Sequence, residues 1–342
     1  MNLKAGALAV AIAALAAAGS ASSARLDRFV AQPLVSDRAD AQLVNAWGLA
    51  ASATGPWWVA NEARSSSTLY DGSGKKQALT VRVPGGPTGV VFYGGRGFVV
   101  RDGGVAGPAR FLYACEDGMI RGWSPVVPDS WSTEAVVAVD AGGSAAVFRG
   151  LALAGERLYA TDFHNARVLV FDSRWRRVVR PGAFVDRAIP SWYAPFGIQA
   201  IGRRIFVTYA WRAPVNGNDA PTGGYVDEFD LDGRLVARVG HSKQLNEPWG
   251  VALTPRGFGR FSGDLLVANF GTGQITAFAR DGRGWRLHGH LPVKAPGVWG
   301  IAFGNGAGSG PRTTLFYAAG PHRWHGASEV DVHGVLGAIT SN

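Results

Sequence analysis

Trp47-Gly48-Leu49-Ala50 is the first of six short apolar segments in which an aromatic or polar residue precedes a glycine. The others are Thr88-Gly89-Val90-Val91, Arg149-Gly150-Leu151-Ala152, Phe196-Gly197-Ile198-Gln199, Trp249-Gly250-Val251-Ala252 and Trp299-Gly300-Ile301-Ala302. Self-similarity at a fixed period is typical of solenoids, propellers and arrays. A period of roughly 50 residues suits a four-stranded propeller blade and is too long for one coil of a β-helix. The sequence therefore predicts an all-β chain, a six-bladed β-propeller.

A second apolar segment follows each copy and is rich in aromatic and β-branched residues, which marks it as a strand. These second strands are Trp57–Asn61, Phe111–Cys115, Arg157–Asp162, Ile205–Tyr209, Leu265–Asn269 and Leu315–Ala319. Third strands end in turn signals such as Asp71-Gly72 and Asp281-Gly282, and Asp-Gly favours a tight hairpin that leads into a fourth strand.

The sixth unit ends one strand short, after a segment that runs from Gly334 to Ile339. An apolar segment from Phe29 to Val35 precedes the first copy, and we predict that this N-terminal strand completes the last blade and removes an exposed edge. Pro33 suits an outer strand, where its missing N–H can face solvent. We expect the repeat glycines to face the narrow axis, where little bulk fits.

The first 24 residues contain Lys4, an apolar run from Ala5 to Ala18 and then small residues. This pattern is typical of a secretory signal, and the run is short for a membrane span. We expect cleavage after Ala21 or Ala24, residues 25–342 as one propeller domain, and export to the periplasm or the medium without an integral membrane segment. The one cysteine, Cys115, excludes an intramolecular disulfide, and its apolar strand predicts a buried, unreactive thiol.

The formal net charge of +9 favours anionic surfaces without choosing among them. Its one cluster is Arg174, Arg176, Arg177 and Arg180. This cluster is either a contact for an anionic glycan or lipid head group, because guanidinium binds phosphate in a bidentate manner, or a solvated hairpin tip. We do not expect nucleic-acid binding, since no binding motif is present.

Longer motifs make the chain resemble an uncharacterised family of exported bacterial NHL-like propellers, some members of which carry a PEP-CTERM sorting tail. The motifs are Asn45–Ala50, Ser67–Gly72, Gly86–Phe92, Glu116–Trp123, Tyr193–Gln199, Phe261–Gly271 and Val298–Gly300. The resemblance implies the propeller and export, and it supplies no activity. The chain departs from it by ending at Asn342 without a hydrophobic tail, and by holding only Asp219 in a loop, Trp211 to Gly224, that is more acidic in relatives. Anchoring through a tail and a metal role for that loop are therefore not expected.

The residues that precede the repeat glycines form the first candidate site. They are Trp47, Thr88, Arg149, Phe196, Trp249 and Trp299, and equivalent positions in a propeller lie around one rim of the axis. Flat aromatic faces beside a guanidinium suit a sugar, an aromatic compound or an anionic small molecule. The alternative is that these rings pack between blades as core.

The ends of the second strands form an alternative, metal-binding site. They carry oxygen ligands suited to Ca²⁺ or another divalent cation: Asn61, Glu62, Glu116, Asp117, Asp162 and Asn269, with His164 nearby. Enzymatic six-bladed propellers such as lactonases bind a divalent cation at the axis with Glu, Asn and Asp. Asp and Asn at strand ends also cap turns, and the sequence leaves both interpretations open.

No nucleophile elbow, zinc-protease motif, phosphate loop or dinucleotide motif occurs in the sequence. No catalytic residue is therefore assigned and no cofactor is certain. We expect a binding or interaction module at one axial mouth, which takes a small molecule, a glycan or an envelope protein and is a monomer. The alternatives are a divalent-metal-dependent hydrolase or lyase of the lactonase type, and a structural cell-envelope protein.

Overall fold

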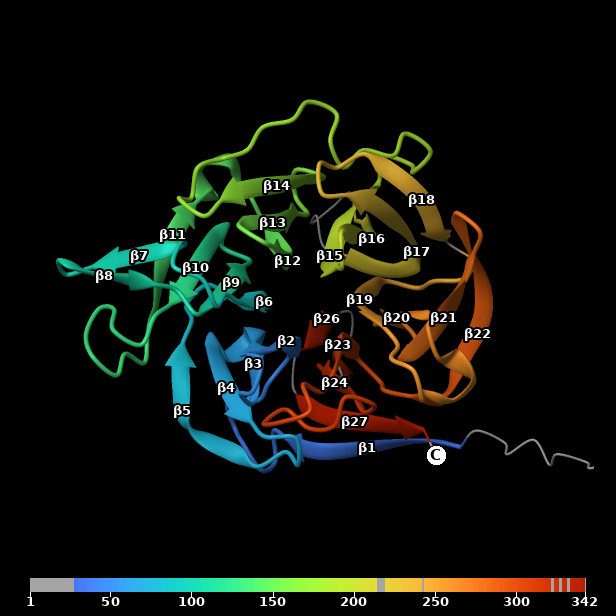
Figure 1. Ribbon diagram of the computed structural model, residues 1–342, viewed down its shortest axis with the longest axis horizontal. Helices are drawn as coiled ribbons and strands as arrows, with labels where there is room; N and C mark the ends of the chain where they lie inside the picture. Colours follow the sequence, from blue (N-terminus) through green and yellow to red (C-terminus); the bar gives the residue numbers. More distant parts are fainter. Residues whose placement is uncertain are drawn as a thin grey trace, which may run out of the picture.

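Six β-sheets stand around a common axis (Figure 1), which confirms the predicted six-bladed propeller. The computed structural model describes residues 28–213, 219–241, 243–320, 323–325, 328–330 and 333–341. The expected signal at residues 1–24 and the side chain of Asp219 lie outside the described part. Adjacent innermost strands contact one another all the way round the ring, so the sixth blade meets the first.

The strands of the first three blades follow one another in chain order from the axis outward. Blade 1 contains β2 (Ala46–Ala51), β3 (Trp57–Asn61), β4 (Ser66–Tyr70) and β5 (Lys76–Arg82). Blade 2 contains β6 (Pro87–Phe92), β9 (Phe111–Cys115), β10 (Met119–Trp123) and β11 (Ala135–Asp140). Blade 3 contains β12 (Phe148–Ala154), β13 (Arg157–Asp162) and β14 (Arg167–Asp172).

The last three blades have four strands each. Blade 4 contains β15 (Tyr193–Ile201), β16 (Arg204–Arg212), β17 (Asp219–Asp230) and β18 (Leu235–Gly240). Blade 5 contains β19 (Pro248–Leu253), β20 (Leu265–Asn269), β21 (Gln274–Asp281) and β22 (Gly284–Lys294). Blade 6 contains β23 (Val298–Phe303), β24 (Leu315–Ala319), β27 (Val335–Ser341) and β1 (Phe29–Ser36).

The N-terminal strand β1 is the outer strand of the last blade, as predicted. It runs antiparallel to β27, and Phe29 pairs with Ser341 at one end of the ladder and Ser36 with Val335 at the other. Pro33 lies on this outer strand, where the register shifts between Pro33 and Val35. Figure 1 shows β1 and β27 side by side at the rim of the molecule, so the ring closes through both ends of the described chain.

The six repeat glycines lie where neighbouring innermost strands meet, and we call them the glycine ring. The structure gives a different reason for glycine at these positions from the one expected from the sequence. A methyl group on Gly300 would lie 2.6 Å from the carbonyl oxygen of Trp47, and one on Gly48 would lie 2.6 Å from that of Thr88. The remaining four glycines likewise lie against the backbone of the next innermost strand. Glycine is needed because neighbouring strands approach each other this closely, rather than because the residue faces the axis.

Blade 3 is the exception, because it lacks a fourth strand and β14 is its outer edge. Two hairpins do not belong to any of the six blade sheets: β7 (Val99–Asp102) with β8 (Val105–Pro108), and β25 (Arg323–His325) with β26 (Ser328–Val330). The first hairpin accounts for the long interval between Gly89 and Gly150. Neither insertion nor the missing strand follows from the repeat pattern.

The core lies between the blades, where apolar side chains of adjacent sheets pack in separate clusters. Cys115 is fully buried in the cluster between blades 1 and 2, beside Trp58 and Tyr113. Burial raises the pKa of its thiol to about 12, so the thiol stays protonated and unreactive. Within the described residues, no helix is long and apolar enough to cross a membrane.

Candidate functional site

The aromatic residues that precede the repeat glycines meet on the axis and fill one end of it. Trp47 stacks on Trp299 with ring centroids 3.8 Å apart, and Phe270 stacks on Trp299 at 3.7 Å. Trp249 and Phe196 meet Trp47 edge to face at 5.7 and 5.9 Å. With Phe163, which lies 5.2 Å from Phe196, these residues form the axial aromatic cluster. Edge-to-face and offset pairs of this kind stabilise a core beyond the area that they bury.

The two polar members of the predicted rim are also packed. The Thr88 hydroxyl is fully buried, within hydrogen-bonding distance of the carbonyl oxygens of Phe148 and Ala114, at 3.0 and 3.2 Å. The Arg149 guanidinium lies over the Trp47 ring, 5.3 Å from its centroid, and pairs with Glu116. This cation–π contact with an ion pair behind it fixes the side chain.

Five of the six predicted rim residues are therefore brought together but turned toward one another, and Thr88 bonds to the backbone instead. Trp249 is the most exposed of them, at 9%. Its indole N–H donates to the Arg149 carbonyl oxygen at 3.0 Å, and that of Trp299 to Asn45 Oδ1 at 3.1 Å. The geometry matches the core interpretation of these rings, because their flat faces are already used in packing.

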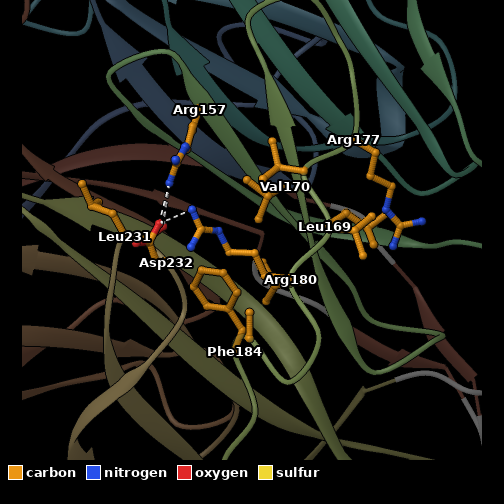
Figure 2. A pocket seen from close by; sticks show the side chains of 12 residues that line it. Arg157, Leu169, Val170, Arg177, Arg180, Phe184, Leu231 and Asp232 are labelled. Carbon is orange, nitrogen blue, oxygen red and sulfur yellow. Dashed lines mark hydrogen bonds and ion pairs between the residues drawn. The ribbon is translucent and has the colours of Figure 1, made fainter.

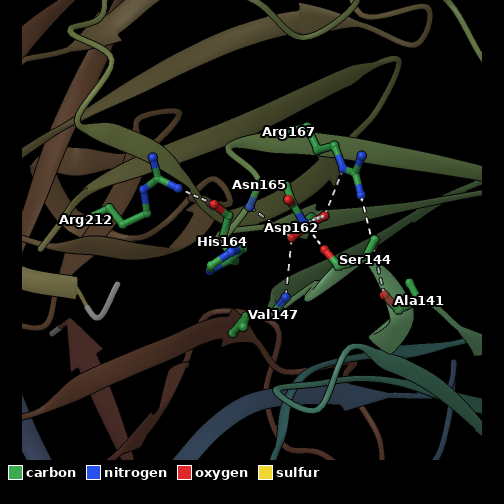
Figure 3. A network of polar contacts seen from close by, with 8 residues as sticks. All are labelled: Ala141, Ser144, Val147, Asp162, His164, Asn165, Arg167 and Arg212. Carbon is green, nitrogen blue, oxygen red and sulfur yellow. Dashed lines mark hydrogen bonds and ion pairs between the residues drawn. The ribbon is translucent and has the colours of Figure 1, made fainter. Parts of the chain in front are cut away.

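Three of the predicted metal ligands are held by their own turns. The buried Asp162 carboxylate accepts from the side chains of Asn165 and Arg167, both at 2.8 Å (Figure 3). Asn269 Oδ1 accepts from the Asn246 amide at 2.9 Å, while its Nδ2 donates to three oxygens of its own hairpin. Asn61 Nδ2 donates to Thr68 Oγ1 at 2.9 Å. These side chains cap strand ends, as Asn and Asp often do.

Glu62 and Glu116, two more of the predicted ligands, have partners from other segments of the chain. Glu62 accepts from Asn45 Nδ2 at 2.9 Å, and Glu116 pairs with Arg149. Both side chains flank Gly86, since a methyl group there would lie 3.0 Å from Glu62 Oε1 and 3.5 Å from Glu116 Cγ.

Asp117 and His164, the last two residues of the predicted metal-binding set, also make hydrogen bonds within the protein. Arg121 holds Asp117 with two bonds of 3.0 and 2.8 Å, and the His164 carbonyl oxygen accepts from Arg212 (Figure 3). Among the described side chains, no three His, Cys, Asp or Glu residues gather in a group that could hold a metal ion.

The opposite mouth of the axis is hollow, and sequence reasoning did not identify it. The second halves of five innermost strands surround a cavity of about 330 Å³. Its lining is mostly apolar: Leu49, Ala50, Ala51, Trp57, Val90, Val91, Phe92, Ala152, Leu153, Ala302 and Phe303, with Gln199, Asn305 and Ser309. Asn305 is occupied, because its Nδ2 donates to the carbonyl oxygens of Ser52 and Gly55. Among the described residues, the exposed Gln199 side chain has one polar contact, 3.5 Å from its Nε2 to the Ala200 carbonyl oxygen.

A second cavity, of about 580 Å³, lies between blades 4 and 5 on the side of the aromatic cluster. It is polar and includes Tyr193, Asn246, Asn269 and His290. Most of these groups are already paired: the Tyr193 hydroxyl donates to the Thr222 carbonyl oxygen at 2.7 Å, and His290 Nδ1 lies 3.1 Å from Thr276 Oγ1. No motif in the sequence marks either cavity, because each is lined by residues from more than one blade.

Solved structures that resemble this chain share its fold. A streptogramin B lyase covers 92% of the chain with a TM-score of 0.52 and 10% identity, over 98% of its own length. Virginiamycin B lyase from Staphylococcus aureus gives 0.52 with 11% identity, over 92% of this chain and 99% of its own. The soluble aldose sugar dehydrogenase of Escherichia coli gives 0.51 with 11% identity, over the same shares of both chains. Identities this low show the propeller fold alone.

Sequence relatives are much closer. The uncharacterised protein R648 of Acanthamoeba polyphaga mimivirus is 36% identical over 279 residues, which is 77% of this chain and 69% of that protein. The uncharacterised protein L690 of the same virus is 33% identical over 257 residues, 71% of this chain and 68% of that protein. No protein-family model matches the chain. The chain therefore belongs to the same family as the mimivirus proteins R648 and L690.

Proposed function

We propose that this protein is a ligand-binding module that takes a small, largely apolar molecule in the axial hollow opposite the aromatic cluster. The observation that carries the proposal is the convergence of five innermost strands on one apolar cavity of about 330 Å³. Small-molecule sites are typically hollows of this size, with apolar walls and a few polar groups that orient the ligand. Gln199 supplies such a group, because its amide offers both donors and an acceptor.

The hollow is also rigid, which favours binding. Its walls are the innermost strands, and the glycine ring fixes the spacing between them. The aromatic cluster closes the axis on the other side. A preformed cavity requires little ordering when a ligand enters, so more of the contact energy appears as affinity.

The test uses 1-anilinonaphthalene-8-sulfonate, an apolar fluorescent anion, as the probe. Gln199→Trp should fill the hollow and reduce probe binding at least about tenfold, which corresponds to about 1.4 kcal/mol. Gln32→Trp, on the exposed face of β1, is the matched control and should bind the probe as the unchanged protein does. Equal binding by both variants, with unchanged melting curves, would remove the hollow as the site.

Alanine variants in the axial aromatic cluster cannot separate a loss of binding from a loss of stability. Trp299 is 1% exposed and stacks between Trp47 and Phe270. Its removal is expected to leave a cavity and destabilise the fold by about 3–5 kcal/mol. A loss of binding in such a variant would therefore report on the fold.

The alternative of a divalent-metal-dependent hydrolase or lyase of the lactonase type has less support. Glu62 and Glu116 lie together near the axis, but Asn61, Asp162 and Asn269 are bonded to their own turns. Elemental analysis of protein purified without chelator tests this alternative. Stoichiometric Ca²⁺, together with a higher melting temperature in added Ca²⁺, would favour it over a binding module.

We also propose that the protein is exported and acts in the periplasm or the medium. The support is the sequence of residues 1–24 and the motifs that resemble bacterial NHL-like propellers, whereas R648 and L690 are viral. N-terminal sequencing of protein recovered from a bacterial periplasm tests this proposal. A mature chain that begins at Ser22 or Arg25 is the expected result, and an uncleaved chain that stays in the cytoplasm would contradict it.

A further inference from the structure

We propose that the open edge of blade 3 accepts an extended acidic peptide, which pairs with the first half of β14, the part that residues 176–178 do not cover. This edge is distant from the axial hollow in the fold, since β14 is the outer strand of its sheet. The proposal rests on backbone groups of β14, a small apolar pocket beside them, and the arginines around that pocket.

Backbone groups at the edge of β14 are only partly used. Val178 N donates to Val170 O at 2.8 Å, and Asp172 N donates to Arg176 O at 2.9 Å. The chain after β14 therefore begins to form a fourth strand and then leaves. Because the direction of backbone groups alternates along an antiparallel strand, Val168 faces the same edge. Its N–H and C=O, and the N–H of Val170, have no hydrogen-bond partner among the described residues.

The departing chain leaves a pocket beside these groups. Its volume is about 80 Å³, enough for one aliphatic side chain, and Val168, Val170, Val178 and Phe184 are among its apolar residues (Figure 2). Val179, which also lines it, is 72% exposed. Strand addition typically combines backbone pairing with pockets for alternate side chains of the added segment.

The far wall of the pocket is fixed, so the loop does not fill the gap. Phe184 is 5% exposed and meets the rings of Tyr159 and Phe229 at 5.8 and 5.3 Å. Its backbone N–H donates to the Gly233 carbonyl oxygen at 2.8 Å. A residue anchored by three contacts of this kind holds the turn away from β14.

The net positive charge around the pocket favours an acidic partner. Three arginines and one carboxylate line the pocket: Arg157, Arg177, Arg180 and Asp232. Figure 2 shows Arg157 and Arg180 converging on Asp232, at 2.8 and 3.0 Å, with Arg177 apart from them. Arg177 is exposed and makes no ion pair with a described residue. A second copy of this chain would place the same arginines against each other, and like charges across a strand pair are destabilising. An acidic segment has the complementary charge.

A fluorescein-labelled seven-residue peptide of alternating Glu and Val tests the proposal by fluorescence anisotropy, with the same peptide carrying Lys for Glu as the comparison. The Glu peptide should bind at least about tenfold more tightly than the Lys peptide at low salt, because exposed ion pairs are screened as salt rises. Equal binding of the two peptides would overturn the proposal.

Two pairs of variants locate the site. Arg177→Glu should weaken Glu-peptide binding at least about tenfold, whereas Arg286→Glu, which makes the same charge change on the outer strand β22, should alter it less than about twofold. Val168→Pro removes the outward N–H and should abolish binding, while Val168→Thr keeps the N–H and should retain it. If Val168→Pro does not fold, the arginine pair still decides.

Equal effects of Arg177→Glu and Arg286→Glu would place the peptide elsewhere and overturn the proposal. Sedimentation velocity supplies a further check. A dimer of the unchanged protein that Val168→Pro dissociates would show that a second copy uses this edge, which also contradicts the proposal.

Discussion

Blades 3 and 6 both lack a fourth strand from the stretch of chain that forms their first three strands, and they differ in what covers the outer edge. In each, the chain that leads directly from blade to blade provides three strands. Blade 6 obtains its fourth strand, β1, from the opposite end of the chain, whereas blade 3 has only the short contact of Arg176 and Val178 with β14 and the anchored Phe184. In Figure 1, β1 lies along β27, while a loop runs outside β14.

The blade at which the two ends of the described chain meet thus has four strands, whereas blade 3 takes its place in the ring with three. Both blades have the same close inner contacts, since Gly150 and Gly300 each lie against the next innermost strand. Only the outer edge differs. An exposed edge is an aggregation hazard unless it is covered or charged, and blade 3 has arginines at its edge where blade 6 has a paired strand.

Removal of β1 should have the largest effect. A chain that begins at Asp37 loses the whole ladder with β27 and the buried Phe29, which packs on Phe258 and Phe261 at 5.3 and 5.6 Å. We expect the melting temperature to fall by about 10 °C or more, measured by circular dichroism. A chain that begins at Arg28 is the control and should melt as the full chain does. Unchanged melting of the shorter chain would show that closure does not depend on β1.

Single substitutions compare the two anchors directly. Phe29→Ala in blade 6 and Phe184→Ala in blade 3 each remove a buried ring, at 7% and 5% exposure, and each should lower the free energy of unfolding by about 3–5 kcal/mol. Urea denaturation measures both. A loss below about 1 kcal/mol for Phe184→Ala would mean that the turn does not take the place of the missing strand.

Alanine at the repeat glycine should destabilise blades 3 and 6 equally. Gly150→Ala and Gly300→Ala each place a methyl group against backbone, 2.8 Å from the Phe196 carbonyl oxygen and 2.6 Å from that of Trp47. We expect each to lower the free energy of unfolding by about 1–3 kcal/mol. Gly143→Ala, where a methyl group would meet no described atom within 4 Å beyond the adjacent residues, is the control and should be neutral. A loss confined to one blade would show that the inner ring is not uniform.

The smallest effect concerns pH at the closing blade. Burial alone would raise the pKa of Asp37, but hydrogen bonds from His333 and the Gly334 amide outweigh it and lower the pKa. The folded chain thus binds fewer protons than the unfolded chain near the ordinary pKa, so this stabilisation is present above that value and lost as pH falls through the lowered one. Asp37→Asn should be slightly destabilising at pH 7 and neutral near pH 2, by urea denaturation. An equal loss at both pH values would exclude this linkage.

Much of the fold follows from local pattern. Five second strands, β3, β9, β13, β20 and β24, have the bounds that the sequence predicts, because apolar residues and turn signals near each other in the chain determine them. The pairing of β1 with β27 was also predicted, since one unit lacked a strand and one strand lacked a unit. The absence of a fourth strand in blade 3 was not predicted. The segment from Trp175 to Val179 mixes apolar and charged residues as outer strands do, so its sequence does not distinguish it from a strand.

The candidate site was less predictable. The repeat pattern places Trp47, Phe196, Trp249 and Trp299 at one level of the axis, as the structure does, but it does not determine whether the rings face solvent or one another. That depends on how rings from opposite blades fill a shared space. The axial hollow could not be predicted for a similar reason, because its walls come from segments far apart in the chain.

The burial of Cys115 has a practical consequence for experiments on this molecule. A thiol that is fully enclosed, with its pKa raised to about 12, does not react with maleimides while the protein is folded. A cysteine introduced at Val179, which is 72% exposed, would therefore carry a dye or a crosslinker alone, with the native cysteine left in place. Site-specific labelling of a blade rim thus requires one substitution.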